Sequence, residues 1–393
     1  MSTHKQTFLT PMIQPDRPIY LDCAATTPID PRVRDVVLHY MDVEFGNAGS
    51  RTHIYGQEAA RGIREAREQI AAVVDARPEE VIFTSGATES NNLALLGLAK
   101  YGIKTGKQHI ISTQIEHKAV LEPLQHLQEQ GFEIEYLKPL KTGYVDPDDV
   151  RRHLRQDTVL VAAMHVNNET GTTQPISEIC SVLSNHPCFF HVDSAQGFGK
   201  ELPQLQNSRI DSISVSAHKL YAPKGVGALI ARSKNKFNRA LSPLTFGGAQ
   251  ERGLRPGTIP CALVCGFAFA ATLSATEQSS HRARWKNLQN QFLQAIDGLR
   301  FEIIGDLSYN QGNILSFRIE NIDSELIILS LKELISISTG SACTSDRIEP
   351  SHVIEAITND SAAAAQVCRA SWCHLTPDIP VGSINSTLRQ LAS

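Results

Sequence analysis

The chain has 393 residues, of which 41% are apolar and 20% charged, and its formal net charge is −4 at pH 7. This length is typical of two domains rather than one small core. The near-neutral charge does not favour direct nucleic-acid binding, and no apolar run approaches the roughly 18 residues of a membrane-spanning helix, so we expect neither kind of partner.

The middle of the chain alternates apolar, β-rich runs with helical stretches. Strands are expected at 81–84, 109–112, 133–137, 159–165, 189–192, 211–216 and 227–231, and helices at 90–101, 119–131, 146–155 and 176–183. Such alternation predicts an α/β fold with a mostly parallel seven-stranded sheet flanked by helices. Ligands of such sheets gather at the carboxyl ends of the strands.

After about residue 258 the pattern changes. One long helix is expected at 262–299, followed by strands at 301–304 and 313–319 and a helix at 324–334. These elements predict a smaller α+β domain. We assign residues 30–260 to the large domain, and residues 1–29 and 261–393 to the small one.

The eight cysteines are scattered and lie mostly in apolar or helical surroundings: Cys23, Cys180, Cys188, Cys261, Cys265, Cys343, Cys368 and Cys373. A protein of this size does not need disulfides to fold, so we expect reduced thiols and a cytoplasmic location. The spacings lack the repeated close pairs of a zinc site, and we predict no metal. Residues 1–18 show no positive-then-apolar signal layout.

Two charged residues end successive strands in the middle of the chain. Asp193 follows one apolar run, and Lys219 follows the next, 26 residues later. A carboxylate at one strand end can pair with a pyridinium nitrogen, and a lysine at a neighbouring strand end can form a Schiff base. This layout suits a pyridoxal phosphate enzyme; the alternative is an ordinary salt bridge in an α/β sheet.

The segment 84–91, Thr-Ser-Gly-Ala-Thr-Glu-Ser-Asn, joins a strand to a helix. Backbone N–H groups of such small residues can point at an anion, and the helix N-terminus adds partial positive charge. We therefore expect a phosphate site here, to which Ser216 and His218 could add contacts. A plain helix cap made by serine or threonine is the alternative.

Further polar residues follow the predicted strands. His117 could stack on a flat cofactor and shuttle protons, although a lone histidine after a strand is often a surface or capping residue. Gln196 could donate to a phenolic oxygen of the cofactor, and Asn168 could bind the same oxygen or a substrate carboxylate.

Cys343 lies in a small polar loop, Ile-Ser-Thr-Gly-Ser-Ala-Cys-Thr-Ser, at residues 337–345. Structural cysteines prefer apolar surroundings, whereas an exposed thiol can reach its thiolate form and act as a nucleophile. An incidental surface cysteine is the alternative reading of this residue alone.

Together, these segments resemble the cysteine desulfurases of the NifS/IscS type, in the class V aminotransferase group of fold-type I pyridoxal phosphate enzymes. The matching segments run in the family's order from about residue 19 to residue 371: Tyr20 to Pro28, Phe45-Gly46-Asn47, Thr84 to Glu89, Glu116 to Val120, Met164 to Glu169, His191-Val192-Asp193, His218-Lys219, Glu251-Arg252-Gly253, Gly257-Thr258 and Gly340 to Ser345.

The resemblance implies a role for each candidate residue. It places the Schiff-base lysine at Lys219, the acid under the pyridine nitrogen at Asp193, the stacking histidine at His117 and the partner of the cofactor's phenolic oxygen at Gln196. It places phosphate contacts at Ala87, Thr88, Ser216 and His218, with Thr258 reaching the phosphate of a second subunit. A homodimer is therefore implied. Asn168 and Arg369 fall on positions that bind the substrate carboxylate, and Cys343 falls on the sulfur-accepting nucleophile.

The implied reaction converts L-cysteine to L-alanine and leaves sulfur on Cys343 as a persulfide for an acceptor protein. The acceptor route could serve DNA phosphorothioates, thiolated tRNA or iron–sulfur clusters. The sequence departs from the family at Cys23, at Ala249 and most of all in the run 372–377, and it ends soon after Arg369. These departures favour a specialised route, such as a DNA phosphorothioation-type member, over docking to an iron–sulfur scaffold protein.

Three alternatives stay open at this point. Another class V reaction, transamination, would use Lys219 and Asp193 but would not need Cys343. Selenocysteine lysis could use the same residues. A non-catalytic scaffold that kept the fold would not need the full set of site residues.

Overall fold

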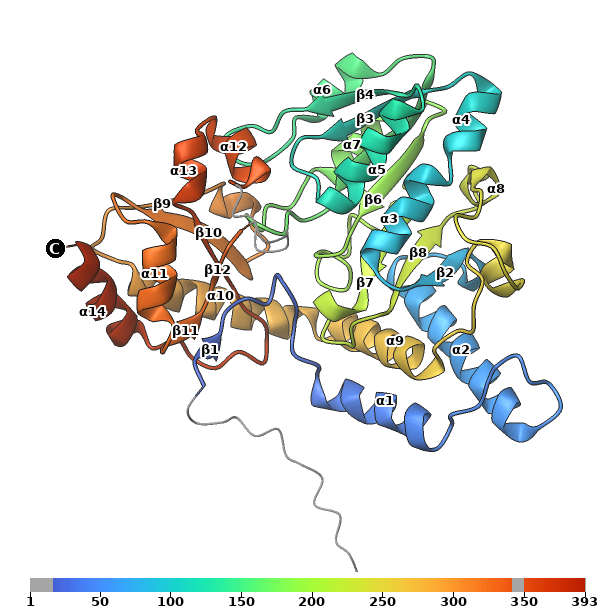
Figure 1. The fold of residues 1–393 in the computed structure, drawn as a ribbon, viewed down its shortest axis with the longest axis horizontal. Helices are drawn as coiled ribbons and strands as arrows, with labels where there is room; N and C mark the ends of the chain where they lie inside the picture. The colour runs from blue at the N-terminus through green and yellow to red at the C-terminus, as the bar shows by residue number, and fades with distance from the viewer. Residues whose placement is uncertain (1–16, 341–349, 393) are drawn as a thin grey trace, which may run out of the picture.

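A seven-stranded sheet forms the larger part of the molecule in the computed structural model, which describes residues 17–340 and 350–392 (Figure 1). The strand order is β2-β8-β7-β6-β5-β3-β4. Five neighbouring strands run parallel, and β8 is antiparallel to both β7 and β2. This confirms the mostly parallel sheet. The bounds are β2 Val81–Thr84, β3 His109–Thr113, β4 Glu133–Leu137, β5 Thr158–Met164, β6 Phe189–Asp193, β7 Ser212–Ser216 and β8 Gly227–Ala231.

Helices cover both faces of this sheet because its strands are apolar on both sides. In β5, Val161 and Ala163 belong to one buried cluster, and Leu160 and Ala162 belong to the cluster on the opposite face. This two-residue alternation is the geometry of a strand with both faces covered. The covering helices are α1 Pro31–Asp42, α2 Ile54–Val73, α3 Ala87–Leu96, α4 Ala99–Thr105, α5 Lys118–Glu129, α6 Pro147–His153, α7 Ile176–Val182, α8 Phe237–Ala240 and α9 Cys261–Thr276.

The single helix expected at 90–101 is wrong in its bounds. It begins at Ala87 and is divided into α3 and α4 near Gly97. The Gly97 carbonyl accepts a hydrogen bond from Ser242 N at 2.8 Å. A side chain at this glycine would come within 2.2 Å of the Leu93 carbonyl oxygen. The close approach of a distant loop therefore interrupts a helical pattern that is continuous in sequence.

The long helix expected at 262–299 is also wrong, since two helices stand there. α9 ends at Thr276, and α10 (Gln278–Ala295) leaves at an angle of 75°. At the break, Glu277 accepts two hydrogen bonds from the Arg32 guanidinium, at 2.6 and 2.9 Å. In the described residues no single helix is long and apolar enough to cross a membrane; only this bent pair has the length and composition.

A smaller α+β unit packs beside the large sheet, as predicted (Figure 1). Its four-stranded antiparallel sheet has the order β12-β13-β10-β9, and β1 pairs in parallel with β11 although the two are far apart in sequence. The remaining elements are β1 Ile19–Tyr20, β9 Phe301–Ile303, β10 Ile314–Ile319, α11 Ser324–Leu331, β11 Ile335–Ser336, β12 Ser338–Thr339, α12 His352–Thr358, α13 Ser361–Ala365, β13 Cys368–Ser371 and α14 Val381–Ala392. The domain bounds given above stay a prediction.

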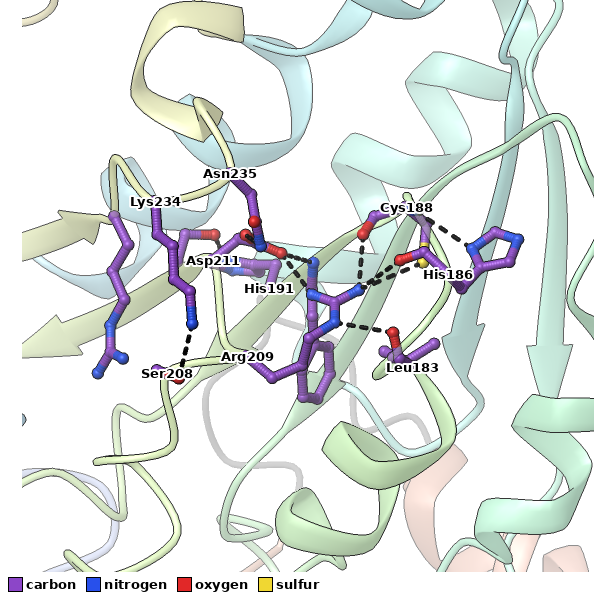
Figure 2. Close-up of polar contacts among 12 residues, drawn as sticks. Leu183, His186, Cys188, His191, Ser208, Arg209, Asp211, Lys234 and Asn235 are labelled. Carbon is purple, nitrogen blue, oxygen red and sulfur yellow. Dashed lines mark hydrogen bonds and ion pairs between the residues drawn. The ribbon is translucent and has the colours of Figure 1, made fainter.

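Arg209 fixes the amino ends of β6 and β7 on the edge opposite the predicted site (Figure 2). Its guanidinium donates to the carbonyls of Leu183, at 2.9 Å, and Cys188, at 2.7 Å, and pairs with Asp211 at 2.7 Å. The same Asp211 carboxylate accepts from Phe190 N at 2.8 Å. The network thus ties the segment after α7 to the start of the strand that ends in Asp193.

Two tryptophans form a matched pair in the small unit, where both are fully buried. Trp372 Nε1 donates to the carbonyls of Trp285, at 3.2 Å, and Gly312, at 3.0 Å, whereas Trp285 Nε1 has no partner among the described residues. We expect Trp372→Phe to lower the free energy of unfolding by about 1–2 kcal/mol more than Trp285→Phe, because only Trp372→Phe removes hydrogen bonds. Urea unfolding, followed by the fluorescence of the remaining tryptophan, measures the difference. Equal losses would contradict it.

Candidate active site

A cavity of about 450 Å³ opens at the carboxyl edge of the large sheet. Its wall includes nine of the twelve residues that the sequence singled out: Ala87, Thr88, His117, Asn168, Asp193, Gln196, Ser216, His218 and Lys219. Thr258 is exposed and does not line the cavity, and Arg369 lies behind the wall. Cys343 lies outside the described residues.

Asp193 ends β6, and its carboxylate is held from two sides. Oδ1 accepts from Ala195 N at 2.9 Å, and Oδ2 accepts from the Asn91 side-chain amide at 2.7 Å. Asn91 Oδ1 lies 2.9 Å from His191 Nε2. Burial lowers the pKa of His191 to about 3, so its ring is neutral. Since the Asn91 amide nitrogen donates to the carboxylate, the Asn91 oxygen accepts from His191 Nε2–H. His191 therefore donates to Asn91, and Asn91 donates to Asp193.

Lys219 lies at the end of the short helix η2 (Ala217–Lys219) that follows β7. Its Nζ donates to the carbonyls of Ala24, at 2.5 Å, and Ala25, at 2.6 Å. Gln196 Nε2 donates to the same Ala24 carbonyl at 2.9 Å. The amino-terminal segment of the chain therefore forms one wall of the cavity and aims the lysine amine, a role that the sequence alone did not reveal.

His117 caps α5 and faces the cavity. Its Nδ1 accepts from Ala119 N at 3.0 Å, which leaves the ring proton on Nε2 when the imidazole is neutral. Burial lowers the pKa of His117, and so favours that neutral form. The preceding Glu116 is fully buried; burial raises its pKa to about 8, so it is protonated at neutral pH. His117 is thus both a helix cap and a cavity residue.

The turn between β2 and α3 forms another part of the cavity wall. Gly86, with φ of 157° and ψ of −177°, adopts a backbone conformation open essentially to glycine, and α3 starts at the next residue. A Cβ on Gly86 would come 3.6 Å from Ser216 Oγ, so the turn and the end of β7 are close together. The amino end of a ten-residue helix with two hydroxyl residues beside it suits an anionic group such as a phosphate.

Gln196 indicates that the cavity suits a polar group. Its Oε1 is buried and has no hydrogen-bond partner among the described residues. A buried amide oxygen without a partner costs about 1–3 kcal/mol, which a bound donor would recover. With Asp193 and the α3 turn in the same cavity wall, the residues present fit pyridoxal phosphate.

Arg369 links the two units behind the cavity. Its guanidinium pairs with Asp22 at 2.8 Å and donates to the carbonyls of Asn168, at 3.1 Å, and Gly340, at 3.3 Å. The side chain is fully buried, and its Nε has no partner in the described part of the chain. The structure thus places Arg369 next to Asn168 but does not bring it to the cavity wall; its contact with a substrate carboxylate stays a prediction.

A lysine, a carboxylate and a histidine at the carboxyl edge of this sheet, with a small α+β unit beside it, define the fold-type I class of α/β enzymes. The chain belongs to the aminotransferase class-V family, whose family model matches residues 19–378. This family is pyridoxal phosphate-dependent. The resemblance inferred from the sequence motifs is therefore confirmed.

Individual proteins agree with this assignment. The chain is 41% identical, over 95% of its length and 76% of the other protein's, to "Cysteine desulfurase, mitochondrial" of Candida albicans. It is 47% identical to the crystal structure of DndA from Streptomyces lividans, with a TM-score of 0.79 over 90% of this chain and 99% of that one. It is 35% identical to "SspA in complex with cysteine", with a TM-score of 0.79 over 92% and 99% of the two chains.

Proposed function

We propose that this chain is a pyridoxal phosphate-dependent cysteine desulfurase, which converts L-cysteine to L-alanine and transfers the sulfur to Cys343 as a persulfide. The observation that carries the proposal is the cavity that Lys219, Asp193 and His117 share with the α3 turn. The family and the relatives named cysteine desulfurase support the same reaction.

The residues divide into those that would hold the cofactor and those that would move protons. Asp193 would pair with the pyridine nitrogen, His117 would cover the ring, and Ala87, Thr88, Ser216 and His218 would bind the phosphate. Gln196 and Asn168 would bind the phenolic oxygen. When bound, pyridoxal phosphate supplies an electron sink for the carbon from which a proton is removed.

Lys219 is the base in this proposal. Its amine donates to the carbonyls of Ala24 and Ala25, which hold it in the cavity. Once it has released its proton, an amine held in this way can accept one from substrate. His117, neutral and with Nδ1 occupied by Ala119 N, presents Nε2 for a second proton transfer.

Cys343 is assigned from the sequence, because it lies outside the described residues. Gly340, three residues before it, is held by Arg369, which also holds the carbonyl of the cavity residue Asn168. Three residues of chain span at most about 10–11 Å. A thiol on so short a tether from this point suits attack on a sulfur atom in the cavity.

A homodimer in the cytoplasm completes the proposal. Thr258, which we expect to contact the phosphate of a second subunit, is exposed and lies off the wall of its own cavity. Large apolar side chains are also exposed in this part of the molecule; Phe246 is 84% and Phe45 64% exposed. Exposed apolar surface of this kind is typical of an interface. Light scattering on the purified chain tests the dimer.

The purified chain, reconstituted with pyridoxal phosphate and given L-cysteine and a thiol reductant, tests the reaction. We expect alanine and sulfide in equal amounts, and a visible absorption band that borohydride bleaches. Alanine formed only when a keto acid is added would instead indicate transamination. Labelled sulfur on Cys343, followed into a cell extract, identifies the acceptor among the DNA, tRNA and iron–sulfur routes.

Asn91 offers a test of the cofactor site that the sequence motifs did not suggest. Asn91→Ala removes a side chain that donates to Asp193, and leaves His191 Nε2 the longer contact with Ser214 Oγ, at 3.5 Å. We expect the affinity for pyridoxal phosphate to fall about tenfold, the equivalent of about 1.4 kcal/mol. Absorbance titration measures it. The matched control is Asn92→Ala, next on the same helix, whose amide donates only to the Thr88 carbonyl. Equal effects of both changes would contradict the assignment.

A further inference from the structure

A second thiol site lies directly behind the cavity wall. Cys23 and Cys373 pack against each other and against Tyr221, and the two cysteines are only 3% and 1% exposed. They stand on adjoining segments: Cys23 N donates to the Ser371 carbonyl at 3.2 Å, and Ala24 N donates to Ser371 Oγ at 2.8 Å. These bonds hold the segment of Cys23 beside the segment that leads to Cys373, and the two side chains belong to one buried cluster.

The two thiols share a proton unequally. The interaction between them raises the pKa of Cys23 and lowers the pKa of Cys373 to about 7. Thr376 Oγ1 adds a second donor to Cys373 Sγ at 3.6 Å. Of the two thiols, Cys373 is therefore the one that loses its proton more readily.

A buried lysine supplies the matching positive charge. Lys200 is 2% exposed, and the titratable groups that act on it are the two thiols and Lys219. Its Nζ lies 5.8 Å from the centre of the Tyr221 ring. Tyr221 has a left-handed backbone, with φ of 61°, and its buried hydroxyl has no hydrogen-bond partner among the described residues. Apolar side chains would be enough to fill this buried space. A cation, two thiols and an unpartnered hydroxyl in one cluster therefore indicate a chemical role.

We propose that Cys23 and Cys373 are a redox-active dithiol that a peroxide converts to a disulfide, with Lys200 as the residue that promotes the reaction. The Cys373 thiolate attacks one oxygen of hydrogen peroxide; the O–O bond breaks, hydroxide leaves, and Cys373 becomes a sulfenic acid. The Cys23 thiol then attacks that sulfur; the S–O bond breaks, and water leaves with the Cys23 proton. The thiolate and the thiol together lose two electrons and one proton, and the peroxide is reduced to hydroxide and water.

This pair of cysteines lies next to the segment that holds the active-site lysine, so its oxidation can affect that lysine. Cys23 directly precedes Ala24 and Ala25, whose carbonyls accept from Lys219 Nζ. A disulfide brings the two sulfurs to about 2.05 Å, closer than a hydrogen-bonded pair of thiols, and so draws this segment toward Ser371. The site stands on these contacts and does not depend on the proposed function.

Peptide mapping tests the proposal on the full-length protein. After treatment with hydrogen peroxide, quenching and alkylation under denaturing conditions, we expect one linked peptide that joins Cys23 to Cys373 and disappears with dithiothreitol. Cys23→Ser and Cys373→Ser should each remove the link. Lys200→Met should slow its formation about threefold, because Lys200 favours the Cys373 thiolate but is the smallest of the groups that do so, after Cys23, Thr376 and the backbone of Leu375.

The chain contains a matched control. Cys261 and Cys265 also lie close, with their sulfurs 3.8 Å apart, but no lysine acts on either of them. This second pair should oxidise at least about tenfold more slowly. The proposal would be overturned if Cys23 and Cys373 are still free to be alkylated after the peroxide treatment while Cys261 and Cys265 have been oxidised. It would also be overturned if Cys23 and Cys373 are oxidised separately, with no disulfide between them. An unchanged rate in Lys200→Met would overturn the role of the lysine.

Discussion

Lys219→Ala should abolish turnover of L-cysteine, with a loss of at least about 10³-fold in rate. The amine lies in the cavity with Asp193 and His117, and two backbone carbonyls fix its direction. The protein should also lose the covalent attachment that borohydride makes permanent. Alanine formation and the retention of label after borohydride measure the two effects.

Two control variants separate chemistry from charge. Lys219→Arg keeps a cation beside the Ala24 and Ala25 carbonyls but cannot act as a base near neutral pH, so it should be as inactive as Lys219→Ala. Lys224→Ala removes a different, exposed lysine from the same cavity wall, and should cost less than about tenfold because an exposed charge is screened. Turnover by Lys219→Ala close to that of the unchanged protein would disprove the proposed mechanism.

The sequence predicted the sheet and the main site residues for the same physical reason. Residues at the ends of parallel strands must meet at one edge, so Asp193 and Lys219 could be placed together from the strand pattern alone. The resemblance added the roles of Thr258 and Arg369, and neither of these residues lies in the cavity wall. Local patterns were sufficient wherever the fold follows from strand–helix alternation.

Contacts between distant segments could not be predicted in this way. The break between α9 and α10 depends on Arg32, 245 residues before Glu277. In the sequence, Asn91 looks like an ordinary helix residue. Only the fold places its amide beside Asp193, which ends β6 and lies 102 residues further along the chain. Ala24 and Ala25 act through their backbone carbonyls, so their side chains give no sign of this role in the sequence. Each of these depends on tertiary packing that a single-sequence pattern does not contain.

Cys343→Ser should separate the two halves of the proposed reaction. The variant should bind pyridoxal phosphate with unchanged affinity, because none of the nine cavity residues is altered. It should form no protein persulfide, and sulfide release should fall at least about 10²-fold, since a serine hydroxyl at neutral pH is a far weaker nucleophile toward sulfur than a thiolate. Mass spectrometry of the protein after incubation with L-cysteine, with sulfide and alanine measured in parallel, gives all three quantities.

The matched control is Cys180→Ser. Cys180 is a buried cysteine of α7 that does not line the cavity, so this variant should form the persulfide at the normal rate.

The contact of Arg369 with the Gly340 carbonyl predicts that the reaction of the Cys343 thiol depends on Arg369. Arg369→Lys, which cannot span Asp22, Asn168 and Gly340 with one planar fork, should lower persulfide formation while Asp193 and Lys219 still bind the cofactor. Full sulfide release by Cys343→Ser would show that sulfur leaves without that cysteine, and would remove the nucleophile from the proposal.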